Sequence, residues 1–63
     1  MIIGEKFIFE VGDPVIDQGD AERRVGLVIA IEQDESGEKV LLVEDEGHPG
    51  QTWRILDKDA VLP

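Results

Sequence analysis

Residues 24–44 read RVGLVIAIE-QDESGE-KVLLVE, two apolar runs on either side of a short polar loop. Aspartate and serine favour turns, and Gly37 suits the left-handed conformation that closes such loops. We therefore expect two paired strands, 24–32 and 39–44. Gly26 lies inside the first of them, where a glycine is typical of a bulge or a sharp bend.

Shorter extended segments flank this hairpin. Residues 7–11 are largely apolar and stop at Gly12-Asp13-Pro14, where glycine permits unusual φ and proline fixes its own. The other expected elements are a short strand at 15–16, a loop at 17–20, a loop at 45–50, a strand at 51–55, a single 3₁₀ turn at 57–59 and a last strand at 61–62. Every run that could begin a helix meets glycine or proline within about ten residues. The sequence predicts one all-β domain over residues 1–63.

The composition excludes several kinds of site. The chain has no cysteine and one histidine, which excludes disulfides, thiolate zinc sites, cysteine nucleophiles and multi-histidine sites. Glu44-Asp45-Glu46 with His48 lacks both the spacing of a calcium loop and a second histidine, so a charged loop is the better interpretation. Ser36, the only serine, lies in the expected turn with no histidine nearby in sequence. We expect no catalytic site, no metal and no cofactor.

Hydrophobic residues make up 41% of the chain, enough to build a core despite the acidity. Residues 1–10 lack a basic segment followed by an apolar one, as an export signal would have. The longest apolar run is far shorter than the ~20 residues that a membrane-spanning helix needs. We expect a folded, cytoplasmic protein with no membrane partner.

Acidity is the most distinctive chemical feature of the sequence. Six lysines and arginines oppose fifteen aspartates and glutamates, a net charge of −9. We expect the acidic residues of the hairpin to gather at its end away from the turn; they are Glu32, Glu44, Asp45 and Glu46. Such a field repels phosphate backbones, which disfavours direct binding of nucleic acid. It is consistent with a solvated surface, with docking to a basic protein surface, or with mimicry of nucleic acid.

Trp53 is the largest side chain in the sequence, and two roles suit it. In the core it would close one end of a small barrel, whereas at an interface it would be a partly exposed anchor, a role in which tryptophan is enriched. Arg54, together with Arg23 and Arg24, forms a cationic group that can pair with nearby carboxylates. The residues that we single out as interaction candidates are Trp53, Arg54, Glu32, Glu44, Asp45 and Glu46.

Both faces of the expected hairpin are apolar, because side chains alternate between the two faces of a strand. The set that we expect to face the core is Leu27, Ile29, Val40 and Leu42. The set that is then left outward is Val28, Ala30, Leu41 and Val43. An exposed apolar strip of this kind favours a protein partner or a homo-oligomer.

The order of the expected elements resembles an SH3-like barrel, and the local sequence resembles the KOW and Tudor-like branch of that fold. The segments that carry the resemblance are Phe9-x-Val11-Gly12-Asp13-x-Val15, Val25-Gly26-x-Val28-x-x-Ile31, Val40-Leu41-Leu42-Val43, Trp53-Arg54-Ile55 and Asp59-Ala60-Val61-Leu62-Pro63. The resemblance covers residues 7–63. It implies a five-stranded SH3-like barrel with a single 3₁₀ turn before the last strand.

The functional residues of that fold are missing from this sequence. KOW-type modules that hold RNA are usually basic, whereas this chain is acidic. Tudor-type readers surround a methylated cation with aromatic side chains, and SH3 domains that bind polyproline use a tyrosine-rich groove. This chain has no tyrosine, two phenylalanines and one tryptophan. The resemblance therefore implies a fold without those activities.

These observations favour a non-catalytic protein-interaction module, such as an accessory or regulatory subunit of a larger assembly, whose partner has a basic surface. The alternative is a nucleic-acid-related role, either as a KOW-like binder or as an acidic mimic that blocks a basic protein site. An enzyme is disfavoured, because paired carboxylates need a buried cleft to separate their pKa values and so small a domain has little interior to spare.

Overall fold

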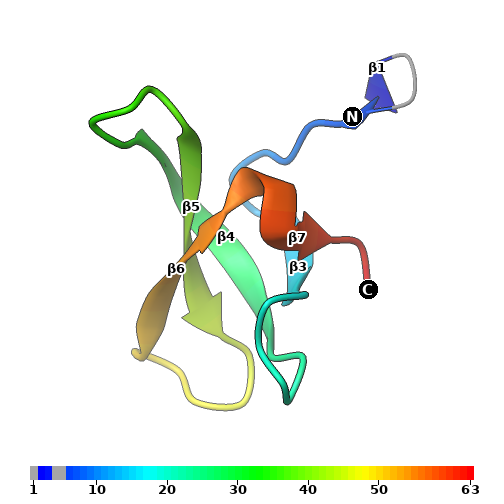
Figure 1. The fold of residues 1–63 in the computed structure, drawn as a ribbon. Helices are drawn as coiled ribbons and strands as arrows, with labels where there is room; N and C mark the ends of the chain where they lie inside the picture. Colours follow the sequence, from blue (N-terminus) through cyan, green and yellow to red (C-terminus); the bar gives the residue numbers. More distant parts are fainter. Residues whose placement is uncertain (1, 4–5) are drawn as a thin grey trace.

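The computed structural model describes residues 2–3 and 6–63, with side chains from residue 8 onward. Its strands are β1 (Ile2–Ile3), β2 (Lys6–Phe7), β3 (Pro14–Asp17), β4 (Val25–Gln33), β5 (Lys39–Asp45), β6 (Thr52–Leu56) and β7 (Ala60–Val61), and the 3₁₀ turn η1 (Asp57–Asp59) lies between the last two. β1 and β2 form a separate antiparallel hairpin (Figure 1). The other five strands form one antiparallel sheet in the order β6-β5-β4-β3-β7. The expected all-β fold, five antiparallel strands with one 3₁₀ turn before the last, is confirmed.

The long hairpin of β4 and β5 is the centre of this sheet. Its turn closes where Gln33 pairs with Lys39, and Gly37 has the left-handed φ of 87° that the turn requires. The carboxylate of Asp34 organises the loop: its Oδ1 accepts hydrogen bonds from the backbone N–H and the hydroxyl of Ser36 and from the N–H of Glu38. The loop chemistry expected from the sequence is therefore present.

The irregularity of β4 lies after Gly26 rather than at it. Val28 pairs with Val43, but the next pair is Ala30 with Leu42, so Ile29 is the extra residue of a β-bulge. Gly26 is required for a different reason. A Cβ at this position would collide with the Val43 side chain and lie 2.5 Å from the Glu44 carbonyl oxygen. The glycine thus permits close packing on β5.

The strand expected over residues 7–11 is wrong beyond Phe7. Asp13 ties this segment into a turn, because its N–H donates to the Glu10 carbonyl and its Oδ2 accepts from the Glu10 N–H. The strand β3 begins at Pro14, although Gly12 N–H already donates to Val28 O and Asp13 O accepts from Val28 N–H. Phe9 lies outside any strand, yet its side chain is buried in the core. Its apolarity was a signal for burial, not for strand pairing.

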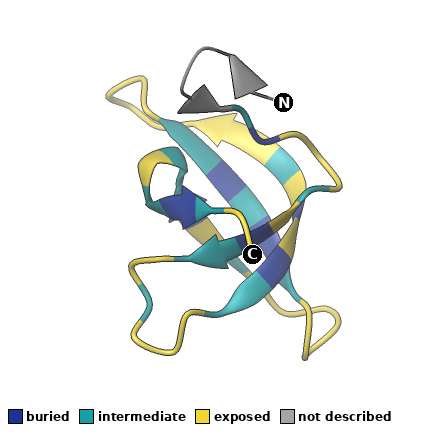
Figure 2. Ribbon diagram, turned by 90° about the vertical axis from the view of Figure 1, so that its right-hand side faces the viewer, coloured by how far each residue is buried: buried dark blue, intermediate teal, exposed yellow. Residues whose placement is uncertain are grey.

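The assignment of the two hairpin faces is also wrong, and the structure reverses most of it. The buried core comprises Phe9, Val15, Val28, Leu41, Val43, Ile55 and Ala60, with Trp53 packed against it. Of the residues expected to face the core, Leu27 and Ile29 are exposed, and Val40 and Leu42 are partly exposed. The inward face is the one that carries Gly26, because only a position without Cβ fits beneath Val43 and Trp53. Figure 2 shows most buried residues on the strands, one buried stretch on the coil before β3, and the exposed residues mainly in the loops.

Candidate functional site

Trp53 is both a core residue and a surface residue. Its register partner on β5 is Val43, so its side chain lies on the inner face of the sheet and packs against the core. The indole Nε1–H donates a hydrogen bond of 2.9 Å to Oδ2 of Asp17 on β3. The side chain is partly buried rather than fully enclosed. The structure therefore assigns Trp53 a packing role that leaves part of the ring accessible.

Arg24 covers this ring. Its Cζ lies 4.0 Å from the centre of the Trp53 ring, within the range of a cation–π interaction. Nη2 of Arg24 donates to Oδ2 of Asp45 at 3.0 Å, and Nε lies 3.8 Å from Oδ2 of Asp20. One guanidinium thus connects the loop before β4, the end of β5 and the tryptophan of β6.

Asp45 is the most strongly engaged of the expected acidic candidates. The Arg24 guanidinium, and after it the N–H of Gly47, holds the pKa of the Asp45 carboxyl below its ordinary value. Its Oδ1 accepts from Gly47 N–H at 2.8 Å and lies 3.6 Å from Nδ1 of His48. Asp45 therefore anchors the 45–50 loop, and its negative charge is compensated by the ion pair with Arg24.

Glu44 and Glu46, on either side of Asp45, have no cationic partner in the part of the chain with described side chains. Oε2 of Glu44 accepts a 3.3 Å hydrogen bond from Gly50 N–H, and the backbone N–H of Glu46 donates to Val25 O at 3.1 Å. A hollow lies between the 17–24 and 45–50 loops, and its acidic lining consists of Asp20, Glu22, Asp45 and Glu46, alongside Arg24 and His48. This end of the molecule carries an excess of carboxylates.

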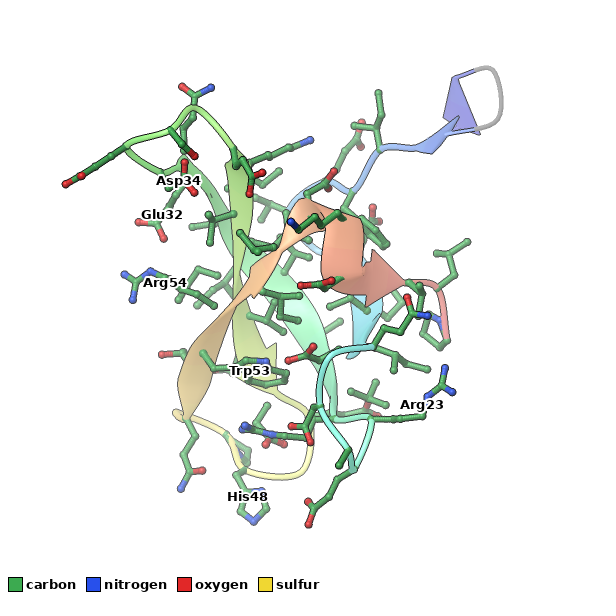
Figure 3. All side chains as sticks on the ribbon, viewed as in Figure 1. Arg23, Glu32, Asp34, His48, Trp53 and Arg54 are labelled. Carbon is green, nitrogen blue, oxygen red and sulfur yellow. The ribbon has the colours of Figure 1, made fainter. Side chains whose placement is uncertain are left out.

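The expected grouping of Glu32 with Glu44, Asp45 and Glu46 is wrong. Glu32 pairs with Val40 near the hairpin turn, whereas Glu44 pairs with Leu27 near the opposite end of β4. Glu32 Oε1 instead accepts from Arg54 Nε at 2.9 Å, across the outer face of β5. Figure 3 shows this pair on the side of the turn and His48 at the far end. An antiparallel hairpin places residues equally distant from the turn together, and Glu32 is too close to it.

Trp53 and Arg54 do not form one site either. Consecutive residues of β6 point to opposite faces, so Trp53 lies inward and Arg54, paired in register with Leu42, lies outward. Sequence reasoning missed Asp17, the hydrogen-bond partner of Trp53, since 36 positions separate the two residues. It also missed Leu27 and Ile29 as exposed residues, because it assigned them to the core.

Over the residues that the structure describes, no group of three histidine, cysteine, aspartate or glutamate side chains is arranged to hold a metal ion. Within the same residues there is no helix long and apolar enough to cross a membrane.

The carboxyl of Asp34 has a pKa below its ordinary value, chiefly because the Ser36 hydroxyl donates to it. That carboxylate belongs to the hairpin loop and shapes its turn.

Comparison of the chain with protein-family models, with curated proteins and with solved structures finds no match.

Proposed function

We propose that this chain is a non-catalytic protein-interaction module, an accessory or regulatory subunit whose partner presents a basic surface. The observation that carries the proposal is the distribution of charge. Two of the arginines form ion pairs within the molecule, Arg24 with Asp45 and Arg54 with Glu32. Glu44 and Glu46 have no such partner among the described side chains. A surface with unpaired carboxylates and a net charge of −9 attracts cationic surfaces and accelerates their association.

The frame that presents this charge is proposed to be an SH3-like barrel of the KOW and Tudor-like kind. The antiparallel pairing of β3 with β7 and the 3₁₀ turn just before β7 support this assignment. The hydrogen bond between Trp53 and Asp17 supports it further, because it joins strands that are separated by two others in the sheet. SH3-like barrels serve many functions, so the frame supports no particular one.

The test is affinity capture on the immobilised chain, followed by reconstitution with the purified partner. We expect a partner with a basic surface, and a dissociation constant that rises with salt because the attraction is electrostatic. A Glu44→Gln/Glu46→Gln variant should bind more weakly, and its binding should depend less on salt. Asp57→Asn, which removes a carboxylate of η1, is the control. A partner whose affinity is indifferent to salt and to the double variant would contradict the proposal.

Mimicry of nucleic acid is the second candidate, and the same unpaired carboxylates favour it. A mimic would not bind RNA or DNA at low salt, but it would displace nucleic acid from a basic protein. Titration of labelled RNA and DNA, followed by competition on the captured partner, separates the two candidates. Direct binding that strengthens as salt falls would instead support a KOW-like binder and contradict both.

A further inference from the structure

The outer face of β4 carries exposed apolar side chains next to one another. Leu27 and Ile29 are 44% and 42% exposed, although both are large aliphatic residues in the middle of the sheet. Pro14 of β3 pairs in register with Leu27, and the bulge brings Ala30 opposite Leu42 of β5. We call these five residues the outer strip: Pro14, Leu27, Ile29, Ala30 and Leu42. Apolar residues adjacent on three strands form a continuous surface rather than scattered single contacts.

Carboxylates border this strip on one side. Glu44 is the register partner of Leu27, so the two side chains lie on the same face of neighbouring strands. Glu46 follows β5 directly; its N–H donates to Val25 O, and its side chain lines the hollow between the 17–24 and 45–50 loops. Neither carboxylate has an ion pair among the side chains that the structure describes. The strip thus combines an apolar contact surface with two neighbouring carboxylates, Glu44 and Glu46, that form no ion pair with the described side chains.

We propose that the outer strip docks a segment of a protein partner in which lysines or arginines flank apolar side chains. This inference rests on the proposed function and adds the surface and the chemistry of the occupant. The apolar side chains of the segment would lose contact with water against Leu27 and Ile29. Its cationic side chains would meet Glu44 and Glu46, which gives the interaction its specificity.

The charge argues against two other occupants. A second copy of this chain bound across a two-fold axis would present the same strip and acidic edge, and no residue of the strip supplies a cation to meet Glu44 and Glu46. Each copy also carries a net charge of −9, which adds repulsion. Nucleic acid would bring its phosphates to the same carboxylates. A cationic protein segment is the occupant that matches both the apolar and the acidic part of the surface.

The experiment uses a short synthetic peptide in which lysines flank two leucines. Backbone amide and methyl NMR of the whole chain locate the peptide, and calorimetry at low salt measures its affinity. We expect shift changes concentrated at Leu27, Ile29 and Leu42. A peptide with serines in place of the leucines should bind at least about tenfold more weakly, and one with glutamates in place of the lysines should not bind.

Two variants of the chain test the strip itself. Leu27→Thr/Ile29→Thr places β-branched residues, which favour strands, at both positions but removes the apolar surface, and we expect about a tenfold loss of affinity. Ile31→Thr is the matched control. Ile31 lies on the same strand and is 40% exposed, but beyond the bulge it pairs with Leu41 and so lies on the other face. The Ile31→Thr variant should bind the leucine peptide with unchanged affinity, and melting temperatures should show that all variants are folded.

Several results would overturn the inference. Equal affinity for the Leu27→Thr/Ile29→Thr variant, or shift changes confined to residues 17–24 and 47–51, would overturn the strip and leave the proposed function standing. A dimer in sedimentation experiments that disappears in the double variant would identify a second copy as the occupant. Failure of the proposed function gives a different result, because then neither the leucine nor the serine peptide would bind at any site.

Discussion

The indole Nε1–H of Trp53 donates to Oδ2 of Asp17 at 2.9 Å, and this bond joins β6 to β3 although β5 and β4 lie between them in the sheet. A flat sheet would hold these strands roughly 14 Å apart, three spacings of 4.7–4.9 Å. The sheet is therefore curved, so that β6 and β3 approach each other on its inner face. Trp53 fills the space on this inner face, and Arg24 stacks on the ring. The hydrogen bond between Trp53 and Asp17 and the cation–π contact between Arg24 and Trp53 both stabilise the curved sheet.

Trp53→Phe tests the value of this bond. The variant keeps an aromatic ring over Gly26 but leaves the Asp17 carboxylate without its indole donor. We expect a loss of about 1–2 kcal/mol in the free energy of unfolding, and each kcal/mol lowers the melting temperature of a small domain by roughly 4–8 °C. The measurement is urea unfolding followed by circular dichroism, since the variant has no tryptophan fluorescence.

A double-mutant cycle with Asp17→Ala separates the bond from other effects of each change, including the loss of the hydrogen bond from Gly19 N–H to Asp17 Oδ1. The coupling energy between Trp53 and Asp17 should be at least about 0.5 kcal/mol. Strict additivity would show that the contact does not contribute to stability.

Gly26→Ala should be strongly destabilising. The added methyl group would collide with Val43 and lie 2.5 Å from the Glu44 carbonyl oxygen and 3.0 Å from the Trp53 ring. Because backbone cannot move away as a flexible side chain can, we expect a cost of about 1–3 kcal/mol or more. Gly47→Ala is the matched control, since its Cβ would be 3.6 Å from the nearest atom. Thermal melts that place both variants at the same midpoint would refute the close-packing explanation of Gly26.

The two neighbouring leucines of β5 test which face is inside. Leu41 is fully buried, and Leu42 points outward and is partly exposed. Leu41→Ala should cost about 2–5 kcal/mol, a large share of the total stability of a domain of this size, which is roughly 3–9 kcal/mol. Leu42→Ala should cost far less, because its side chain leaves no internal cavity. Chemical denaturation measures both, and equal costs would contradict the assignment of the faces.

The five strands of the main sheet, the central hairpin and the 3₁₀ turn could be predicted because their signals are local, whereas the strand expected at 7–11 does not extend beyond Phe7. Gly37 and Asp34 specify the hairpin loop within a few residues, and glycine or proline interrupts every candidate helix. The face of each strand could not be predicted in the same way. Both faces of β4 are aliphatic, and the bulge at Ile29 changes the alternation in the middle of the strand, so no single period-two pattern describes it.

The candidate site was predictable in composition but not in geometry. The acidic residues could be named from the sequence, yet the register of the hairpin separates Glu32 from Glu44. Asp17 gave no signal, because its contact with Trp53 depends on the curvature of the whole sheet. Gly26 was the residue that could have identified the inner face. A strand glycine that admits another backbone must lie on the packed side, and Val28 follows it by two positions.

Acid should remove part of the stability through Asp45. Its pKa in the folded state lies below the ordinary value of 3.8, mainly because of Arg24. A carboxyl with a lowered folded pKa stabilises the fold fully above its unfolded pKa, and this contribution is lost as the pH falls toward the folded pKa. The stability difference between wild type and Asp45→Asn should therefore be constant near neutral pH and narrow below about pH 5. Denaturation at a series of pH values measures it.

Glu46→Gln provides the control for that experiment, because it removes a neighbouring charge without removing an ion pair seen in the structure. If the difference between wild type and Asp45→Asn stayed constant down to acid unfolding, the contact between Arg24 and Asp45 would not stabilise the folded state preferentially.

Salt should stabilise this protein. With a net charge of −9, repulsion among carboxylates opposes the compact state. Raising sodium chloride from about 0.01 M to about 0.1 M shortens the Debye length from roughly 30 Å to roughly 10 Å, so the repulsion weakens more than close ion pairs do. The melting temperature should rise over this range.

Glu46→Lys, which relieves repulsion directly, should melt higher than wild type at low salt and converge with it at high salt. A melting temperature that falls with salt would mean that exposed pairs such as Arg54 with Glu32, whose side chains are 64% and 43% accessible, outweigh the repulsion.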